Sequence, residues 1–288
     1  RQVGSTIKPI LYTLAMQEGL GPCDKVPNIP QTFILPTGEP WSARGGTKRQ
    51  GEMVTLRWGL ANSENNISAW VLKQFTPEAV AQMAHKMGIT SFIDPVPSVF
   101  LGTAEITVKE MVAAYSIFAN KGVYNSPLPV YRIEDKYGNV LQEFRPESRE
   151  VITENTAYLM CNLLEGVVTG VRLRYKYKLM NPMGGKTGTT QKHADGWFMG
   201  VTPDLVGGVW VGAEDRSIHF QNLANGQGAS MALPIWAKFL LKAYADPRLK
   251  MSDRPAGINK RLDCDETISE AEVKEMNNGI REDEEEFY

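Results

Sequence analysis

The spacing of apolar residues changes in the last third of this chain of 288 residues, and that change decides the fold class. Up to about residue 166 the apolar residues mostly recur every three to four positions, the spacing of helices that bury one face. Between residues 184 and 212, three short segments bounded by turn residues are typical of β-strands. Helices followed by sheet, without an internal repeat, predict an α+β domain.

Local signals divide the chain into elements. An apolar stripe near the start stops at Gly19, and Thr107 and Glu110 form a capping box for a helix that ends before Gly122. The expected helices cover residues 5–18, 55–61, 67–75, 77–87, 107–121, 154–166 and 231–245. The expected strands cover residues 184–190, 196–202 and 205–212, with a hairpin at 129–144. Residues 22–52 hold five prolines and no periodic pattern, so we expect an irregular excursion over the surface there.

The composition excludes several kinds of site. The three histidines, His85, His193 and His219, include no pair at metal-ligand spacing, so a histidine metal site is not expected. No G-x-S-x-G sequence is present to carry the nucleophile of a Ser-His-Asp hydrolase. No run of 18 apolar residues occurs, so no segment is expected to span a membrane.

The three cysteines, Cys23, Cys161 and Cys264, lie far apart in the sequence and form no C-x-x-C pair. A disulfide framework or a zinc site therefore cannot be built from sequence neighbours, and the redox compartment stays open. With 42% apolar residues, the chain is long enough to bury a large core without such crosslinks.

The formal net charge of −2 is unevenly distributed. Residues 263–288 contain eleven acidic and two basic residues, a charge of −9, which leaves +7 for the rest. Because such a run is usually solvated, we expect a domain over residues 1–250 and an acidic, disordered tail over residues 251–288. The chain begins at Arg1 without a signal-peptide pattern, so we also expect it to be a piece of a longer protein.

Three short motifs occur once each, in a fixed order. They are Ser5-Thr6-Ile7-Lys8, Ser63-Glu64-Asn65 and Lys186-Thr187-Gly188. Each motif alone is common by chance, but all three in this order are expected by chance on the order of once in a hundred such chains. Together they match the S-x-x-K, S-x-N and K-T-G pattern of penicillin-binding proteins and serine β-lactamases.

The spacing of the first motif suits nucleophilic catalysis. Residues three apart on a helix share a face, at about 5 to 6 Å between Cβ atoms, so Lys8 can reach the hydroxyl of Ser5. A neutral lysine would serve as the base, and the helix N-terminus and the ammonium of Lys186 would both lower its pKa. Taken alone, the pair also fits an N-cap followed by a surface lysine.

The second and third motifs supply polar groups of other kinds. Ser63 would pass a proton between Lys186 and a leaving amine, or would simply cap the helix that follows. Asn65 would orient Lys8 and the substrate amide. On a strand, Lys186 and Gly188 face one way.

Thr187 and Thr189 then face the other way, and their hydroxyls can hold a terminal carboxylate. Gly188 would leave room for the backbone of a substrate.

Longer strings around these motifs resemble the transpeptidase domain of class A, bifunctional penicillin-binding proteins. R-Q-V-G-S-T-I-K-P at residues 1–9 is similar to the family's R-Q-P-G-S-x-x-K-P. G-K-T-G-T-T followed by D-G-W-F, within residues 185–198, is similar to its G-K-T-G-T-T…D-x-W-F. The likeness extends over residues 1 to about 245. It implies a β-lactamase/transpeptidase-like fold, an antiparallel sheet flanked by helices, with the family's N-terminal strands, membrane anchor and glycosyltransferase domain absent from this chain.

The resemblance also implies a peptidoglycan D,D-transpeptidase that β-lactams inhibit covalently. The implied partners are stem peptides, as D-Ala-D-Ala donor and amine acceptor, and β-lactams, with no nucleic acid, no cofactor and no metal. The implied location is periplasmic, on the outer face of a bacterial cytoplasmic membrane to which the full-length protein is anchored. The implied catalytic residues are Ser5, Lys8, Ser63, Asn65 and Lys186. The implied substrate-binding residues are Thr187, Gly188 and Thr189, with the backbone N–H groups of Ser5 and Thr189 as oxyanion hole.

Other functions are weighed against this one. A serine β-lactamase or D,D-carboxypeptidase would carry the same motifs, but no E-x-x-L-N sequence lies between Ser63 and Lys186, which favours a long-lived acyl-enzyme. A catalytically silent penicillin-binding fragment is a further alternative. A phosphate-binding loop at Gly185 would need a glycine where Met180 stands.

Overall fold

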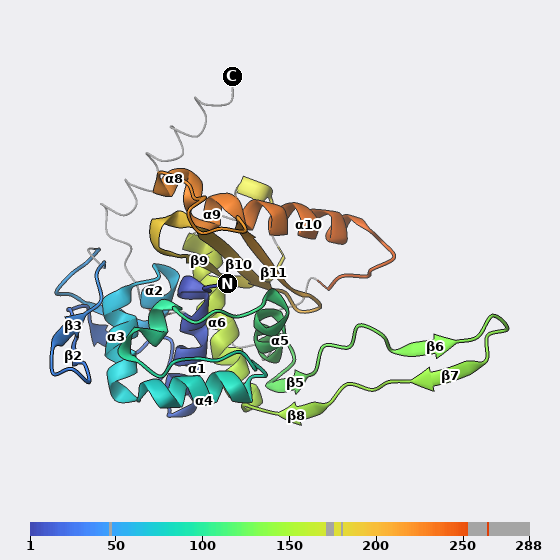
Figure 1. The fold of residues 1–288 in the computed structure, drawn as a ribbon, viewed down its shortest axis with the longest axis horizontal. Helices are drawn as coiled ribbons and strands as arrows, with labels where there is room; N and C mark the ends of the chain where they lie inside the picture. Colours follow the sequence, from blue (N-terminus) through green and yellow to red (C-terminus); the bar gives the residue numbers. More distant parts are fainter. Residues whose placement is uncertain (46–47, 171–175, 180, 253–263, 265–288) are drawn as a thin grey trace, which may run out of the picture.

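The computed structural model describes residues 1–45, 48–170, 176–179, 181–252 and 264. Figure 1 shows two layers: a group of helices from the first part of the chain, and a twisted sheet covered by the last helices. A long two-stranded arm leaves the helical layer. The N-terminus lies where the two layers meet, because its first turn packs on the edge strand of the sheet.

The sheet has three antiparallel strands among the described residues, in the order β11-β10-β9. They are β9 (Gly184–Thr189), β10 (Asp195–Val201) and β11 (Val206–Gly212). One face is covered by α9 (Gly228–Met231) and α10 (Leu233–Ala245), with α8 (Leu223–Gly226) next to α9. The other face is covered by α5 (Val108–Ala119) and α6 (Glu154–Gly170). The predicted antiparallel sheet flanked by helices is therefore confirmed.

A close approach fixes α10 on the sheet. An ideal Cβ at Gly200 would lie 2.2 Å from the indole of Trp236, so the strand needs glycine there. Trp236 is 1% exposed and packs on Phe198, with ring centroids 5.1 Å apart. This packing makes a second, smaller core between the sheet and α10.

The helical layer surrounds α1, which is buried on nearly every side. A 3₁₀ turn, η1 (Gly4–Ile7), leads directly into α1 (Lys8–Gln17). The other elements are α2 (Leu56–Ala61), α3 (Asn65–Gln74), α4 (Pro77–Lys86), η2 (Pro97–Leu101), α5 (Val108–Ala119) and α6 (Glu154–Gly170). The predicted capping box of Thr107 and Glu110 is present at the start of α5.

The predicted elements are confirmed with several corrections. The opening helix starts as a 3₁₀ turn, and α3 begins at Asn65, so this asparagine belongs to a helix rather than to the preceding loop. The segment 22–52 is less irregular than expected. It contains β1 (Lys25–Pro27), β2 (Thr32–Ile34) and β3 (Pro40–Ser42), where β1 pairs with β4 (Met53–Thr55) and β2 with β3. Strands of three residues are too short to show a period of two.

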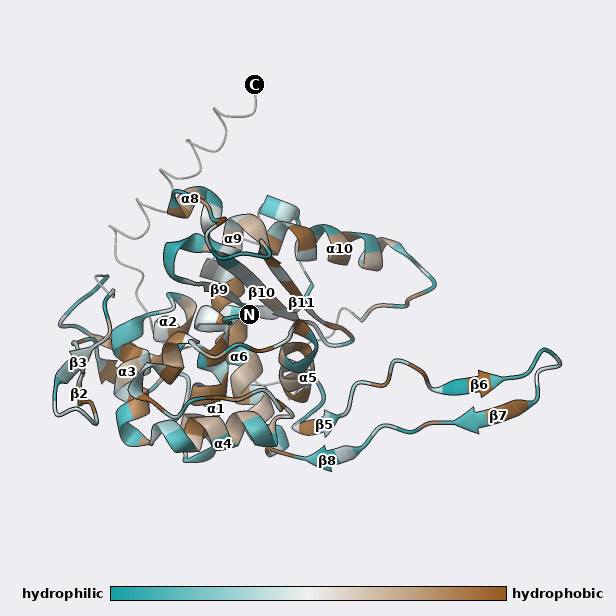
Figure 2. Cartoon of the chain, viewed as in Figure 1, coloured by the Kyte–Doolittle hydropathy of each residue, from teal (hydrophilic) through white to brown (hydrophobic). Residues whose placement is uncertain are grey.

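The arm confirms the predicted hairpin at 129–144. It consists of β5 (Val123–Asn125) paired with β8 (Ser148–Glu150), and β6 (Arg132–Glu134) paired with β7 (Val140–Glu143). At its tip, the Asp135 carboxylate accepts hydrogen bonds from the N–H groups of Tyr137 and Asn139. Figure 2 shows apolar residues along the arm although it extends away from the body.

A disulfide joins Cys23 to Cys264, 241 residues apart in the sequence, with 5.0 Å between the Cα atoms. Sequence spacing did not predict this pairing, because its partners meet only through the fold. Beyond residue 250 the structure describes only Met251, Ser252 and Cys264, so the expected disorder of the tail concerns residues outside the described ones.

Candidate active site

Ser5 stands on η1, and its neighbours in the chain are tightly held. Gly4 has φ +54°, and an ideal Cβ there would lie 2.9 Å from the Thr189 carbonyl oxygen, so β9 approaches this turn closely. The Gly4 N–H donates to the Gly102 carbonyl at 3.1 Å. The hydroxyl of Tyr115 donates to the Thr6 carbonyl at 2.7 Å. Ser5 is therefore carried on a turn fixed from three sides.

Lys8 follows Ser5 by one 3₁₀ turn, a spacing that brings side chains onto the same side. It is fully buried, and its Nζ donates to the Ser63 carbonyl at 2.6 Å and to Asn65 Oδ1 at 2.8 Å. The hydrogen bonds of the described residues include none between Lys8 and the Ser5 hydroxyl. In this structure Lys8 is thus held by the second motif rather than by Ser5.

Ser63 lies between the two lysines of the site. Its Oγ accepts a hydrogen bond from Lys186 Nζ at 2.9 Å and lies 3.4 Å from Lys8 Nζ. The backbone of Ser63 has φ +56°, a left-handed turn that joins α2 to α3. The alternative interpretation of Ser63 as a helix cap is wrong, because the N-cap position of α3 is Glu64.

Lys186 is fully buried on β9 and also donates to its neighbour's carbonyl, Thr187 O, at 3.1 Å. The predicted alternation along β9 is confirmed, since Lys186 and Gly188 are buried while Thr187 and Thr189 are half-buried.

The space that a side chain at Gly188 would take is already occupied. An ideal Cβ there would lie 2.5 Å from the Val3 carbonyl oxygen, so this glycine makes room for the segment that carries Ser5.

Burial perturbs the protonation of both lysines. Desolvation and, second, the Lys186 ammonium hold the pKa of Lys8 well below its usual value, against an opposing effect of the Glu64 carboxylate. Burial lowers the pKa of Lys186 to about 7. The lowered pKa predicted for Lys8 is confirmed, and burial is its larger cause. A neutral lysine that can accept a proton is therefore available near neutral pH.

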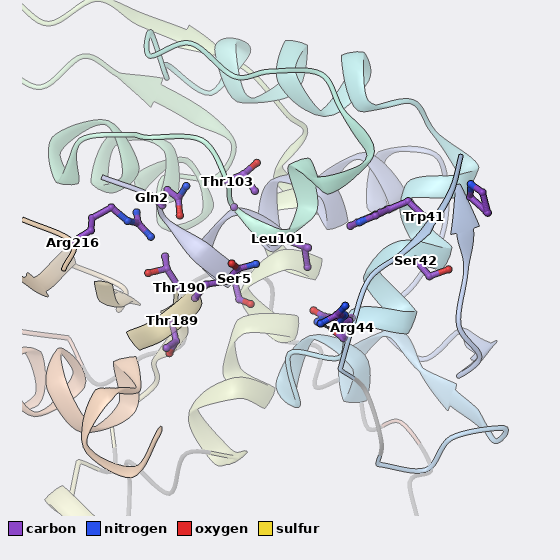
Figure 3. A pocket seen from close by; sticks show the side chains of 14 residues that line it. Gln2, Ser5, Trp41, Ser42, Arg44, Leu101, Thr103, Thr189, Thr190 and Arg216 are labelled. Atoms are coloured by element: carbon purple, nitrogen blue, oxygen red, sulfur yellow. Dashed lines mark hydrogen bonds between the residues drawn. The ribbon is translucent and has the colours of Figure 1, made fainter. Parts of the chain in front are cut away.

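A cleft of about 920 Å³ opens beside Ser5. Figure 3 shows Thr189 and Thr190 near Ser5, with Arg216 beyond them and Trp41, Ser42 and Arg44 farther away in the other direction. The lining residues are Gln2, Ser5, Pro40, Trp41, Ser42, Arg44, Asn65, Leu101, Gly102, Thr103, Thr189, Thr190, Gln191 and Arg216. Of the predicted site residues, Ser5, Asn65 and Thr189 line the cleft, and the buried lysines lie behind it.

Comparison with known proteins decides the family. The family model described as "Penicillin binding protein transpeptidase domain" matches residues 1–215. This chain belongs to the penicillin-binding protein transpeptidase family.

Relatives within this family confirm the predicted resemblance to class A members. Penicillin-binding protein 1A of Aquifex aeolicus is 33% identical over 241 residues, covering 83% of this chain and 33% of that protein. The same-named protein of Neisseria lactamica is 30% identical over 265 residues, covering 88% and 33%. The chain therefore spans about a third of the length of these relatives.

Solved structures share the transpeptidase fold. Penicillin-binding protein 1A from Haemophilus influenzae superposes with a TM-score of 0.79 at 23% identity, covering 92% of this chain and 45% of that one. PonA1 from Mycobacterium tuberculosis, in complex with penicillin V, gives 0.74 at 24%, covering 91% and 73%.

Some residues of this transpeptidase site had no signal in the sequence. Trp41 and Arg44 come from the β2–β3 region, and Arg216 follows β11, all outside the three motifs. Asp195, the first residue of the D-G-W-F string, is fully buried, but it was not predicted as a site residue. It pairs with Arg1 Nε at 3.0 Å and Arg216 Nη1 at 3.1 Å, and so ties the first residue to the end of the sheet.

The described residues offer no group of three His, Cys, Asp or Glu side chains that could hold a metal ion. No helix in the described part of the chain is both long and apolar enough to cross a bilayer.

Proposed function

We propose that this domain is a D,D-transpeptidase that crosslinks peptidoglycan stem peptides through an acyl-enzyme on Ser5. The observation that carries the proposal is the convergence of two fully buried lysines on Ser63, directly behind the cleft that Ser5 lines. Buried lysines are rare unless they are functional, because desolvation disfavours their charge.

In the acylation step, Ser5 Oγ attacks the carbonyl carbon between the two terminal D-alanines. Its proton passes to neutral Lys8 as the new C–O bond forms. The C–N bond then breaks, and the leaving D-alanine takes a proton that Lys186 supplies through the Ser63 hydroxyl. The 2.9 Å bond from Lys186 to Ser63 supports this route.

In the second step, an amine of a neighbouring stem peptide attacks the Ser5 ester. A new amide bond forms, the C–O bond breaks, and Lys8 returns its proton to the serine oxygen. The proton lost by the amine passes through the Ser63 hydroxyl to Lys186, so both lysines regain their starting protonation. Asn65 holds Lys8 in place through both steps, since its Oδ1 accepts from Lys8 Nζ and its Nδ2 donates to the Arg44 carbonyl at 2.7 Å.

The N–H groups of Ser5 and Thr189 form the oxyanion hole in this proposal. Ser5 lies in the first turn of η1, where N–H groups have no intrahelical partner. The Thr189 nitrogen lies 3.1 Å from the ideal Cβ position of Gly4, which puts that backbone next to the nucleophile's turn. The hydroxyls of Thr187 and Thr189, half-buried on the other side of β9 from Lys186, bind the substrate carboxylate, and Gly188 acts indirectly by admitting the Ser5 turn.

The substrate and location follow from the same assignment. Stem peptides and β-lactams are the proposed partners, and the periplasmic side of the membrane is the proposed location. The Cys23–Cys264 disulfide supports a compartment that is oxidising rather than cytosolic.

Covalent labelling by a fluorescent penicillin, resolved under denaturing conditions, tests the proposal. We expect stable label on the wild type, none on Ser5→Ala and greatly slowed labelling of Lys8→Ala. Ser148→Ala, on the exposed arm, is the matched control and labels normally.

The outcomes separate the alternatives. Folded wild type that takes no label would refute the catalytic assignment and leave a silent fragment. Label that is lost within seconds indicates a β-lactamase. A D-Ala-D-Ala peptide that is hydrolysed but never joined to an added amine indicates a D,D-carboxypeptidase.

A further inference from the structure

A third ionisable side chain is buried next to the residues that bind Lys8. Glu64 lies between Ser63 and Asn65, the two residues that bind Lys8 Nζ, and it is 4% exposed. Its Oε1 is buried without a hydrogen-bond partner. Natural proteins rarely leave a buried carboxylate oxygen without a hydrogen-bond partner, so the unpaired Oε1 of Glu64 needs an explanation.

The backbone fixes where this carboxylate lies. The Glu64 N–H donates to the Gly59 carbonyl at 2.8 Å, and the Glu64 carbonyl accepts from Ser68 N at 3.2 Å and from Ser68 Oγ at 3.0 Å. The side chain is therefore set at the start of α3, beside α1. Its charge acts on two residues one helical turn apart on α1, Lys8 and Tyr12.

The charges of the cluster balance only when Glu64 is counted. Two protonated lysines and an ionised Glu64 together carry a buried net charge of +1. When one of the lysines is neutral, the net charge of the three groups is zero. A buried site strongly favours the neutral total. Without the carboxylate, even a single ammonium in the pair would be uncompensated, and the pair would tend to lose both protons.

We propose that Glu64 is a positioning residue for acylation, whose buried carboxylate keeps one proton on the Lys8–Lys186 pair. This inference rests on the proposed function. Glu64 acts through Lys8 and Lys186 and not on the substrate, since it is not among the described residues that line the cleft. Its negative charge makes Lys8 basic enough to accept the Ser5 proton, and it keeps Lys186 protonated as the donor to the leaving amine.

The other groups that face Glu64 agree with this role. Lys8 and the exposed Lys48 favour its ionised form, as do the N–H groups of Asn65 and Asn66 at the start of α3. Burial opposes them and raises the pKa of Glu64 overall. Tyr12 is buried, and burial raises the pKa of its hydroxyl well above its usual value, so it stays neutral.

The test is the pH profile of acylation by the fluorescent penicillin in Glu64→Gln. The acid limb reports protonation of Lys8, and the base limb reports loss of the Lys186 proton. Removing the negative charge lowers both lysine pKa values, so both limbs move to lower pH by about one unit. At pH 8 that shift appears as roughly tenfold slower acylation.

Two variants control for structure. Glu110→Gln also removes a buried carboxylate, but one bound by Thr90, Ser91 and Thr107 rather than near the lysines, so its limbs stay at wild-type pH. Glu64→Asp keeps the charge and therefore keeps both limbs within a fraction of a unit. A shift in Glu64→Asp as large as in Glu64→Gln would overturn the proposal.

A lower plateau with unmoved limbs in Glu64→Gln, or limbs that move to higher pH, would overturn it as well. If folded Glu64→Gln is too slow to assay, ¹³Cε-lysine NMR reads the pKa of Lys8 directly, and an unchanged value overturns the proposal. Wild type that takes no label refutes the proposed function itself. Labelled wild type with unmoved limbs in the variant refutes only the role of Glu64.

Discussion

Replacing Lys186 by methionine should abolish acylation and yet stabilise the folded protein. The lysine is fully buried, and burial lowers its pKa from 10.5 to about 7. The unfolded chain therefore binds a proton between pH 7 and 10.5 that the folded chain mostly lacks. Because stability rises with pH wherever the unfolded state binds more protons, the folded wild type gains stability as the pH rises through this window.

The size of the effect follows from the pKa shift. A shift of this size disfavours the folded state by about 4 kcal/mol at pH 7, at about 1.4 kcal/mol per unit. Lys186→Met removes that penalty but also removes hydrogen bonds to Ser63 and Thr187, each of about 1 kcal/mol. We expect a net gain of about 2 kcal/mol in the free energy of unfolding at pH 7.

Urea unfolding at several pH values between 7.5 and 9.5 measures this. The free energy of unfolding of the wild type should rise more steeply with pH than that of Lys186→Met, by about 1.4 kcal/mol per pH unit. Lys238→Met, at an exposed position on α10, is the matched control and keeps the wild-type slope. Equal slopes for wild type and Lys186→Met would refute the lowered pKa of Lys186. They would also refute the idea that this lysine gains and loses its proton near pH 7.

Three further predictions concern the frame of the site. Cys23→Ser should lower the free energy of unfolding by up to roughly 5 kcal/mol, because the disulfide closes a loop of 241 residues. Adding a reductant to the wild type during thermal unfolding should reproduce this loss of stability. Gly4→Ala should slow penicillin acylation about a hundredfold, since a Cβ would push the Ser5 turn off Thr189; unchanged labelling would contradict this. Hydrogen bonds hold the pKa of Glu110 well below its usual value, against the opposing effect of burial. The ionised carboxylate therefore stabilises the folded state above about pH 4.5, and this stabilisation is lost on acidification. Acid unfolding monitored by circular dichroism should be less steep in Glu110→Gln.

Much of the fold could be predicted from local patterns in the sequence. The capping box at Thr107 and the alternation of Lys186 with Thr187 follow from residues close in sequence, and the structure has both. The residue at which a helix begins depends less on local signals. The expected helix over 67–75 leaves Asn65 outside it, but Asn65 starts α3, where tertiary packing of α3 against α1 outweighs the weak helix preference of the polar residues there.

The features that the sequence did not predict all depend on contacts between distant segments. Gly188 looked like room for a substrate, yet Val3, 185 residues earlier, fills that space. The partner of Cys23 and the cleft wall at Trp41 likewise depend on how separate elements pack. The motifs therefore predicted the residues that we propose to react, while much of the cleft wall comes from residues outside every motif.

The disulfide also changes what a cut in the chain does. Cys23 and Cys264 turn the residues between them into one covalent ring, and the exposed arm of β6 and β7 lies on that ring. A protease that cleaves once at the tip of the arm opens the ring without separating its two parts. The piece with Ser5 and the piece with Lys186 stay attached until the disulfide is reduced, so a nicked molecule runs as one band without reductant and as two with it.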